Sequence, residues 1–382
     1  MKRKNVWIWL LGLICLAVLA GLAPGQEGPK KERGEAVARP KKKDGGGTTA
    51  PEPEGEKIPS RFKKKDGELP PEGTPTFRTD VNTVTVDVAV LDNKGRFIPN
   101  IPRGNFRILE DDQPQQVASF AMGEAPMTVA MVIEFSNLFQ RYWTETWYQT
   151  LVAAHGFLET LKPEDFVAVV AYDIRPEILS DFSQNKQNAY EAMRRLQIAA
   201  YSESNLYDAV TDTADRMSEI EGRKAIVLVS SGMDTFSKLT FDQTRKKLQA
   251  AGVPIYAIGL MQALREWYDA RGFLGPIARL DFLQADNQMR TFAKETGGQS
   301  FFPRFYGEFP GIFRAISDSL RNQYSLTYQP TNQARDGKFR KIKVELVNPE
   351  NNQPLRILDE KNKPIKYQVL AKAGYTAPRE VE

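Results

Sequence analysis

The sequence predicts an α/β fold: a doubly wound, mostly parallel sheet with helices on both faces, flanked by β segments that can form a β-sandwich. From residue 127 onward, apolar runs of strand length alternate with amphipathic stretches of helix length, the pattern of a parallel sheet with helical crossovers. Strand patterns without helices lie on either side of this block. The expected segments are a leader (1–25), a tether (26–76), an N-terminal β segment (77–125), the α/β domain (126–322) and a C-terminal β segment (323–377).

Residues 1–25 have the pattern of an export signal. Basic residues 2–4 precede an apolar run over residues 6–22, and the small residues Ala23 and Gly25 follow, at positions suited to signal-peptide cleavage. An uncleaved signal anchor is the alternative, because the run is near the lower limit of about 17 residues for a spanning helix. We expect an exported protein, periplasmic, in the cell envelope or secreted, with membrane contact only through an uncleaved leader.

Cys15 is the only cysteine, and it lies inside the apolar run of the leader. A cleaved chain would have no thiol. Disulfides, zinc–thiolate sites and cysteine nucleophiles are therefore excluded for the cleaved chain.

Residues 26–76 are rich in Pro, Gly, Lys and Glu and almost free of aliphatic side chains. Such a segment cannot bury enough apolar surface to offset its ordering entropy, so it predicts a disordered tether. The formal net charge of +4 comes from the leader and from residues 27–69. A nucleic-acid-binding protein carries its positive excess on a folded face, and we therefore expect no nucleic-acid partner.

The first ordered segment is β. Valines alternate with other residues over 84–90, a period of two that indicates a half-buried strand. Residues 106–110 and 117–120 flank a turn at 111–114, and this arrangement predicts a hairpin.

The α/β block then alternates strands and helices. Residues 240 and 243 predict a capping box, and Gly252 predicts the end of the same helix. The expected strands are 128–135, 166–171, 225–229, 254–260 and 299–302. The expected helices carry apolar stripes over 147–161, 206–220, 240–248, 289–293 and 312–320.

The tail returns to β, with strands expected at 324–328, 339–347, 355–358 and 367–371. Two arrangements are compatible with β segments on both sides of the α/β block. Either both flanks form one sandwich into which the α/β domain is inserted, or they form two small separate units.

Three loops with polar side chains follow strands or precede a helix, at residues 134–138, 202–208 and 230–234. Doubly wound sheets place functional loops at the carboxyl ends of their strands. We therefore expect a binding site where these loops meet.

These loops resemble the von Willebrand factor A family, in which D-x-S-x-S, a threonine and an aspartate together hold a divalent cation in a metal-ion-dependent adhesion site. Glu134 takes the place of the first aspartate, Ser136 of the first serine and Leu138 of the second. Ser204 takes the threonine position. Ser231 falls at the last acid, with Asp234 three residues later.

The resemblance extends over residues 79–377 to the exported bacterial (acidobacterial-type) VWFA-related domain proteins. It is carried by the opening valine-rich strand and residues 324–330, 336–340 and 374–375. It implies the fold more than a role.

The resemblance implies a degenerate metal site at Glu134, Ser136, Ser204 and Asp234. Divalent cations prefer oxygen ligands, but Leu138 offers none and Ser231 removes a charge. We expect a weakly bound Mg²⁺, Mn²⁺ or Ca²⁺ at most, and otherwise no cofactor. In the alternative interpretation, Glu134 and Ser136 cap the next helix or bond to neighbouring loops.

Aromatic residues follow the first loop: Tyr142, Trp143 and Trp147. Trp and Tyr are enriched at interaction hot spots, so an exposed aromatic rim beside Glu134 is expected; a core role is the alternative. The further expected ligand contacts are Asn137, Asn205 and Ser231.

His155 is the only histidine and lies in the middle of an expected helix, so no nucleophile–base pair is evident. The sequence therefore predicts no enzyme, but an exported module that recognises a protein or an envelope-surface ligand. A structural scaffold of an envelope assembly is the alternative, and a hydrolytic enzyme is the weaker one. The oligomeric state is not predicted.

Overall fold

A computed structural model describes residues 83–93, 95–136, 143–196, 201–272, 275–358 and 361–379. The expected leader and tether lie outside these residues. All of the described residues belong to one compact unit, Glu56–Glu382. No helix within the described ranges is long and apolar enough to cross a membrane.

The central element is a six-stranded sheet in the order β10-β9-β8-β5-β6-β7. Five strands run parallel, and β7 pairs antiparallel with β6 at the edge. The predicted doubly wound, mostly parallel sheet is confirmed. The strands are β5 (Met127–Glu134), β6 (Phe166–Tyr172), β7 (Pro176–Ser183), β8 (Arg223–Ser230), β9 (Ile255–Gly259) and β10 (Ser300–Phe301).

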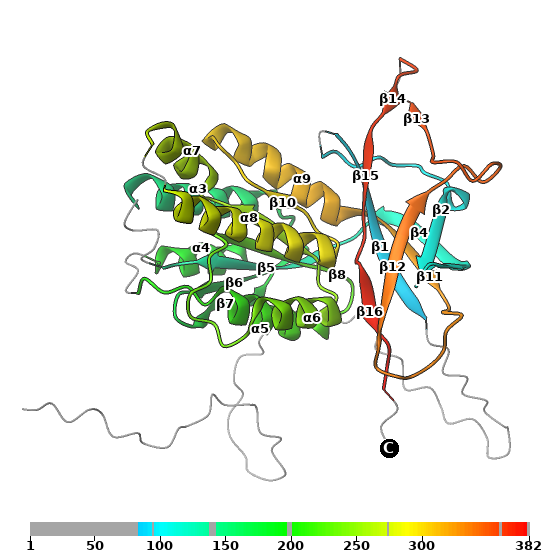
Figure 1. Ribbon diagram of the computed structural model, residues 1–382, viewed down its shortest axis with the longest axis horizontal. Coiled ribbons are helices and arrows are strands. Elements are labelled where there is room, and N and C mark those ends of the chain that lie inside the picture. Colours follow the sequence, from blue (N-terminus) through cyan, green and yellow to red (C-terminus); the bar gives the residue numbers. More distant parts are fainter. Residues whose placement is uncertain are drawn as a thin grey trace, which may run out of the picture. The chain divides into compact units, whose positions relative to one another are not determined.

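Helices cover both faces of this sheet (Figure 1). One apolar cluster joins the sheet to α3, α4 and α9, and a second joins its other face to α5, α6 and α8. Every residue of β5 and β6 is buried, as expected for strands covered on both sides. The helices are α3 (Trp143–Thr160), α4 (Lys186–Arg194), α5 (Leu206–Ser218), α6 (Phe241–Ala251), α7 (Gln262–Ala270), α8 (Pro276–Thr296) and α9 (Phe309–Arg321), with 3₁₀ turns η1 (Arg103–Asn105) and η2 (Tyr306–Glu308).

The N-cap and the C-cap of α6 are those that the sequence predicts. Thr240 and Gln243 form a reciprocal capping box at its start. Gly252 ends it in the left-handed conformation, with φ of 63°, where a side chain would be strained.

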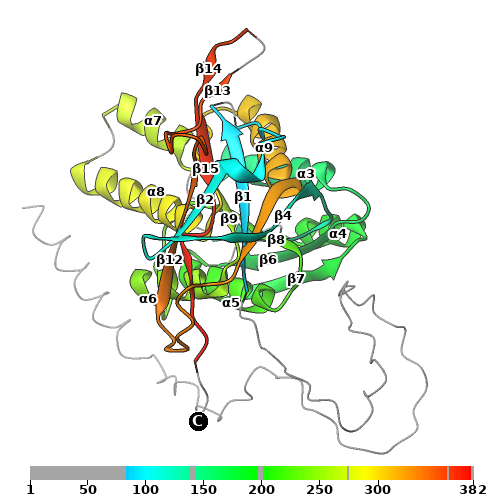
Figure 2. The same ribbon diagram turned by 90° about the vertical axis from the view of Figure 1, so that its right-hand side faces the viewer.

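The two β flanks form one sandwich, into which the α/β domain is inserted between β4 and β11. Figure 2 shows β1, β2 and β4 of the first flank beside β12 and β15 of the second. Its sheets have the orders β15-β1-β11-β4 and β16-β12-β2-β3, so strands from both ends of the chain pair directly and share one core. The strands are β1 (Val84–Asp92), β2 (Phe106–Glu110), β3 (Gln113–Gln115), β4 (Val117–Glu124), β11 (Asn322–Tyr328), β12 (Phe339–Leu346), β15 (Tyr367–Leu370) and β16 (Gly374–Thr376), beside a separate pair, β13 (Ile357–Leu358) and β14 (Pro364–Ile365).

The expected hairpin between residues 106–110 and 117–120 was wrong. β2 turns through Asp111 and Asp112, both with positive φ, and pairs with the short β3. The chain then crosses to the other sheet, where β4 pairs with β11. Alternating side chains identify a strand but do not identify its partner, and here the partner is about two hundred residues away.

Asp165 ties together the two places where the chain crosses between the sandwich and the α/β domain. Its Oδ1 accepts a hydrogen bond from the backbone N–H of Met127, at the start of β5, at 3.0 Å. Its Oδ2 accepts from Nη2 of Arg321, the last residue of α9, at 2.8 Å. Both side chains are buried. Arg223 reinforces the same region, since its guanidinium donates to the carbonyls of Arg321 and Gly123.

We predict that Asp165→Ala lowers the free energy of unfolding by about 3–5 kcal/mol, because it leaves the Arg321 guanidinium buried without its partner. Urea unfolding measures this loss. Asp269→Ala is the matched control: it breaks the half-exposed pair with Arg279 and should cost about 1 kcal/mol or less. Equal losses for the two variants would contradict a central role for Asp165.

Candidate functional site

Three neighbouring strands end beside one another at the carboxyl edge of the sheet. β8, β5 and β6 are adjacent, and their last residues are Ser230, Glu134 and Tyr172. All three side chains are buried, as is that of Ser231, the next residue after β8. The sheet thus gathers a carboxylate and several hydroxyls into one polar cluster.

The Glu134 carboxylate is surrounded by protein donors. Its Oε2 accepts from the backbone N–H and the hydroxyl of Ser231, at 2.7 and 2.8 Å, and from the hydroxyl of Ser230 at 2.9 Å. The Tyr172 hydroxyl lies 3.5 Å from the same oxygen. Oε1 accepts from the Ser136 hydroxyl at 2.9 Å. Both carboxylate oxygens are therefore satisfied within the protein.

No cationic side chain is among these donors. The absence of a cation affects the pKa values of Glu134 and Tyr172. Burial raises the pKa of Glu134, and the hydrogen bonds from Ser231, Ser136 and Ser230 only partly offset it. Burial also raises the pKa of Tyr172 well above its ordinary value, and the carboxylates of Glu134 and Asp234 add to the effect. Glu134 thus holds its proton to higher pH than an exposed glutamate does.

Ser204 joins its loop to the loop after β8. Its hydroxyl donates to the Met233 carbonyl, and its backbone N–H donates to the Thr235 hydroxyl, both at 2.8 Å. The Ser204 carbonyl accepts from the backbone N–H groups of Thr235 and Phe236. Ser204 is fully buried, so its polar atoms serve the loop contact.

Asp234 lies at the start of α5, where its Oδ1 accepts from the backbone N–H of Tyr207 at 3.2 Å and from the Ser237 hydroxyl. A carboxylate is favourable there because a helix N-terminus carries partial positive charge. Asn205 accepts from the same Ser237 hydroxyl and donates to the Ile174 carbonyl. Asn205 and Ser231, expected as ligand contacts, are thus buried in bonds between loops.

The four expected metal ligands are brought to one edge of the sheet, where each also forms hydrogen bonds within the protein. Glu134 and Ser136 bond to each other, Ser204 donates to a carbonyl, and Asp234 caps α5. A divalent cation needs several oxygens whose lone pairs face one point. In the described part of the chain, no group of three or more His, Cys, Asp or Glu side chains is placed to hold a metal. In this arrangement Glu134 and Ser204 both bond to the loop after β8.

Most side chains of the expected aromatic rim are not among those that the structure describes. Asn137 and Tyr142 lie in the undescribed range 137–142, and Trp143 and Trp147 belong to α3 without described side chains. Other aromatic side chains are exposed on loops of the same edge: Tyr201 (48% exposed), Phe236 (56%) and Phe305 (73%). These residues precede α5, follow β8 and follow β10.

Sequence reasoning missed these three aromatic residues, and also Tyr172 and Ser230. Their positions in the sequence could have indicated them. Tyr172 and Ser230 directly follow apolar strand runs, and Phe236 is an aromatic residue among polar ones. An aromatic residue in a polar loop after a strand has no core to enter, which marks it as an exposed contact.

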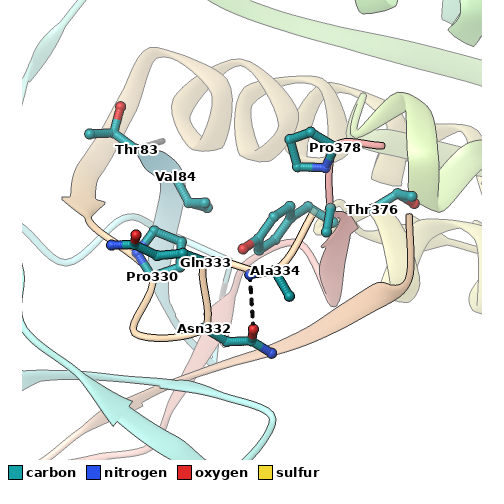
Figure 3. Close-up of a pocket in the computed structure, with 10 residues that line it drawn as sticks. Thr83, Val84, Pro330, Asn332, Gln333, Ala334, Thr376 and Pro378 are labelled. Atoms are coloured by element: carbon teal, nitrogen blue, oxygen red, sulfur yellow. Dashed lines mark hydrogen bonds between the residues drawn. The ribbon is translucent and has the colours of Figure 1, made fainter. Parts of the chain in front are cut away.

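Two other features give no catalytic site. His155 of α3 lies edge-on to the ring of Tyr190 in α4, and burial lowers the pKa of His155. A hollow of about 390 Å³ lies at one end of the sandwich, between Pro330, Gln333 and Thr376 (Figure 3). Its lining contains no charged side chain.

Comparisons with known proteins bear on the α/β domain. Residues 129–233 match the family model of the von Willebrand factor type A domain, and no curated protein matches the sequence. Solved structures are similar at low identity. Proximal thread matrix protein 1 from the mussel byssus is 12% identical, with a TM-score of 0.40 over 56% of this chain and 51% of that chain. The alignment thus spans about half of the mussel protein.

Two bacterial structures are similar at the same level. The vWF domain of the type V pili tip protein Mfa5 from Porphyromonas gingivalis is 14% identical, with a TM-score of 0.39 over 52% of this chain and 97% of that chain. The von Willebrand factor type A structure from Catenulispora acidiphila is 11% identical, with a TM-score of 0.38 over 77% and 75%. The family match and the doubly wound sheet agree: residues 129–233 of the α/β domain match the von Willebrand factor type A domain.

Proposed function

We propose that this protein is an exported binding module that recognises a protein surface through the loops at the carboxyl edge of its six-stranded sheet, without a bridging cation. A von Willebrand factor type A domain supports a binding role in general. Export is supported by the signal pattern of residues 1–25. The choice of this edge as the binding surface is supported by the exposed apolar side chains on its loops.

The observation that carries this proposal is the distribution of exposed large apolar side chains. Tyr201, Phe236 and Phe305 lie on loops of this edge, and Leu280 and Leu283 lie on the first turns of α8, which begins there. They make up half of all exposed large hydrophobic side chains in the described ranges. Scattered apolar residues are normal on a surface, but a concentration of aromatic ones supports an interaction site.

The polar cluster beneath supports the same role. Glu134 forms hydrogen bonds to Ser136, on the loop after β5, and to Ser231, on the loop after β8. Ser204, on the loop before α5, bonds to the same loop after β8. Loops fixed in this way lose little conformational entropy on binding, and preorganisation of this kind strengthens an interface.

We predict that the double variant Tyr201→Ala/Phe236→Ala loses partners that the wild-type protein captures from envelope extract in the presence of a chelator. Removing two exposed aromatic contacts should weaken binding by about 2–4 kcal/mol. Both side chains are half-exposed, so the variant should unfold like the wild type. Quantitative mass spectrometry of the captured material measures the loss.

The matched control is Met122→Ala/Leu358→Ala, which removes one exposed apolar side chain from strand β4 of the sandwich and one from the separate β13–β14 pair. Its captured partners should equal those of the wild type. Equal recovery by both double variants would refute recognition through this edge, and recovery that needs a divalent cation would refute the cation-free mode.

We also predict a characteristic pH dependence for Glu134. Because burial raises its native pKa above the ordinary value of 4.5, the native state binds its proton more tightly than the unfolded chain. The stability from this protonated group is fully present below about pH 4.5 and is lost as pH rises through the raised native pKa. The variant Glu134→Gln cannot titrate, and its amide can accept from Ser231 and donate to Ser136.

The unfolding free energy of the wild type should therefore fall relative to that of Glu134→Gln by up to ~1.4 kcal/mol per pH unit within this window. Urea unfolding at a series of pH values measures the difference, and parallel curves would contradict it. Added Mg²⁺, Mn²⁺ or Ca²⁺ should leave the wild-type melting temperature unchanged. A rise that disappears in Ser136→Ala would instead show a cation held by this site.

A further inference from the structure

A groove of about 520 Å³ lies between the C-terminal part of α8 and the strands β12 and β15 of the sandwich. Figure 1 shows this end of α8 beside β15 and β16. The groove is separate from the aromatic loops, which lie at the carboxyl edge of the sheet. Arg290 and Lys294 line it from α8, and Lys343 and Lys372 line it from the sandwich.

The charge of this lining is one-sided. Four cationic side chains line the groove, and no Asp or Glu is among its described lining residues. The helix C-terminus accounts for one of them, because Lys294 lies in the last turn of α8, where a cation is favourable. It does not account for Lys343 and Lys372, which come from another part of the chain.

Only one of the four cations has a carboxylate partner within the described residues. Lys343 pairs with Glu345 at 2.6 Å, and the Arg290 guanidinium lies 4.0 Å from the centre of the Phe302 ring. Neither Lys294 nor Lys372 forms an ion pair within the described residues. Burial lowers the pKa of Lys372, an effect that Asp87 partly offsets. Lys372 in turn lowers the pKa of Lys224, and both lysines line a neighbouring hollow with Asp87.

The backbone holds these charges in place. The Ala373 N–H donates to the Glu295 carbonyl at 3.0 Å, which fastens the segment after β15 to the end of α8. Gly297, with φ of 86°, lies against the segment after β15. A Cβ atom at this position would lie 2.5 Å from the backbone nitrogen of Lys372. The backbone at Lys372 is therefore fixed against the end of α8.

Two free strand edges border the groove. β10 ends the six-stranded sheet and β15 ends a sheet of the sandwich, and residues of both line the groove. An edge strand presents unpaired backbone groups to which an extended peptide can add. Strand edges favour a peptide over a compact anion, and the cations select its charge.

From this combination we propose that the groove binds an extended acidic segment of a partner protein. Carboxylates of the segment contact Lys294, Lys343 and Lys372, and its backbone lies along the edge of β10 or β15. The interaction is separate from recognition by the aromatic loops, and either can fail without the other.

The test measures fluorescence anisotropy of a fluorescein-labelled peptide of alternating glutamate and threonine, titrated with the full chain. A peptide with glutamine in place of glutamate is the charge control. The glutamate peptide should bind saturably and more weakly at higher salt, and the glutamine peptide should bind at least about tenfold more weakly. Equal binding of the two peptides would overturn the proposal.

Two double variants locate the binding. Lys294→Gln/Lys343→Gln should weaken it by about tenfold or more. Lys246→Gln/Lys338→Gln removes the same charge from exposed lysines outside the groove and should leave it nearly unchanged. Equal weakening of peptide binding by both variants would mean a nonspecific charge effect and would overturn the proposal that the peptide binds in the groove. Pyrophosphate that binds as tightly as the peptide, and displaces it, would show a small-anion site and overturn the peptide assignment.

Discussion

The fold depends on one buried carboxylate, Asp165, because it contacts both crossings between the two domains. One crossing leads from β4 into β5 at Met127, and the other leads from α9 into β11 at Arg321. β5 lies in the middle of the six-stranded sheet and β11 lies between β1 and β4 of the sandwich. A shift at Asp165 would therefore move an interior strand of each domain. Its buried pair with Arg321 fixes position as much as it stabilises, which is the better-supported role of such pairs.

Asp165 and Glu134 are both buried acids of this domain, but their partners differ. Asp165 faces a guanidinium. Glu134 faces three serines and a tyrosine, together with one backbone N–H. Neutral donors compensate a buried charge less completely than a cation does, and this is the physical reason that the pKa of Glu134 is raised. The acid that in the related family would face a cation is here part of an internal network that joins the loops.

The loops and the groove give the molecule two chemically different surfaces. The carboxyl edge presents aromatic and aliphatic side chains over the fixed network of Glu134, whereas the groove beside α8 presents cations and strand edges. Because the groove is lined by both the α/β domain and the sandwich, its shape depends on the insertion of one into the other. Neither domain alone would contain it.

The sequence by itself determined the features that depend on neighbouring residues. The apolar runs of β5 and β8, the capping box at Thr240 and the stop at Gly252 are all local signals, and each could be predicted from the chain. The other strands and helices of the α/β domain were predicted from the same patterns, but β7, α4 and α7 were not.

Only the tertiary structure decided which distant segments meet. It chose one sandwich over two β units by pairing Val84 with Tyr328, and it moved β4 away from its expected hairpin partner. It also placed the Glu134 carboxylate against the backbone N–H of Ser231 and directed the Ser204 hydroxyl to the Met233 carbonyl. Spacing along the chain shows that these residues reach one edge, but the direction of each lone pair depends on contacts across the fold. For that reason the sequence could indicate the edge at which these residues meet, while the direction of each hydrogen bond followed from the structure.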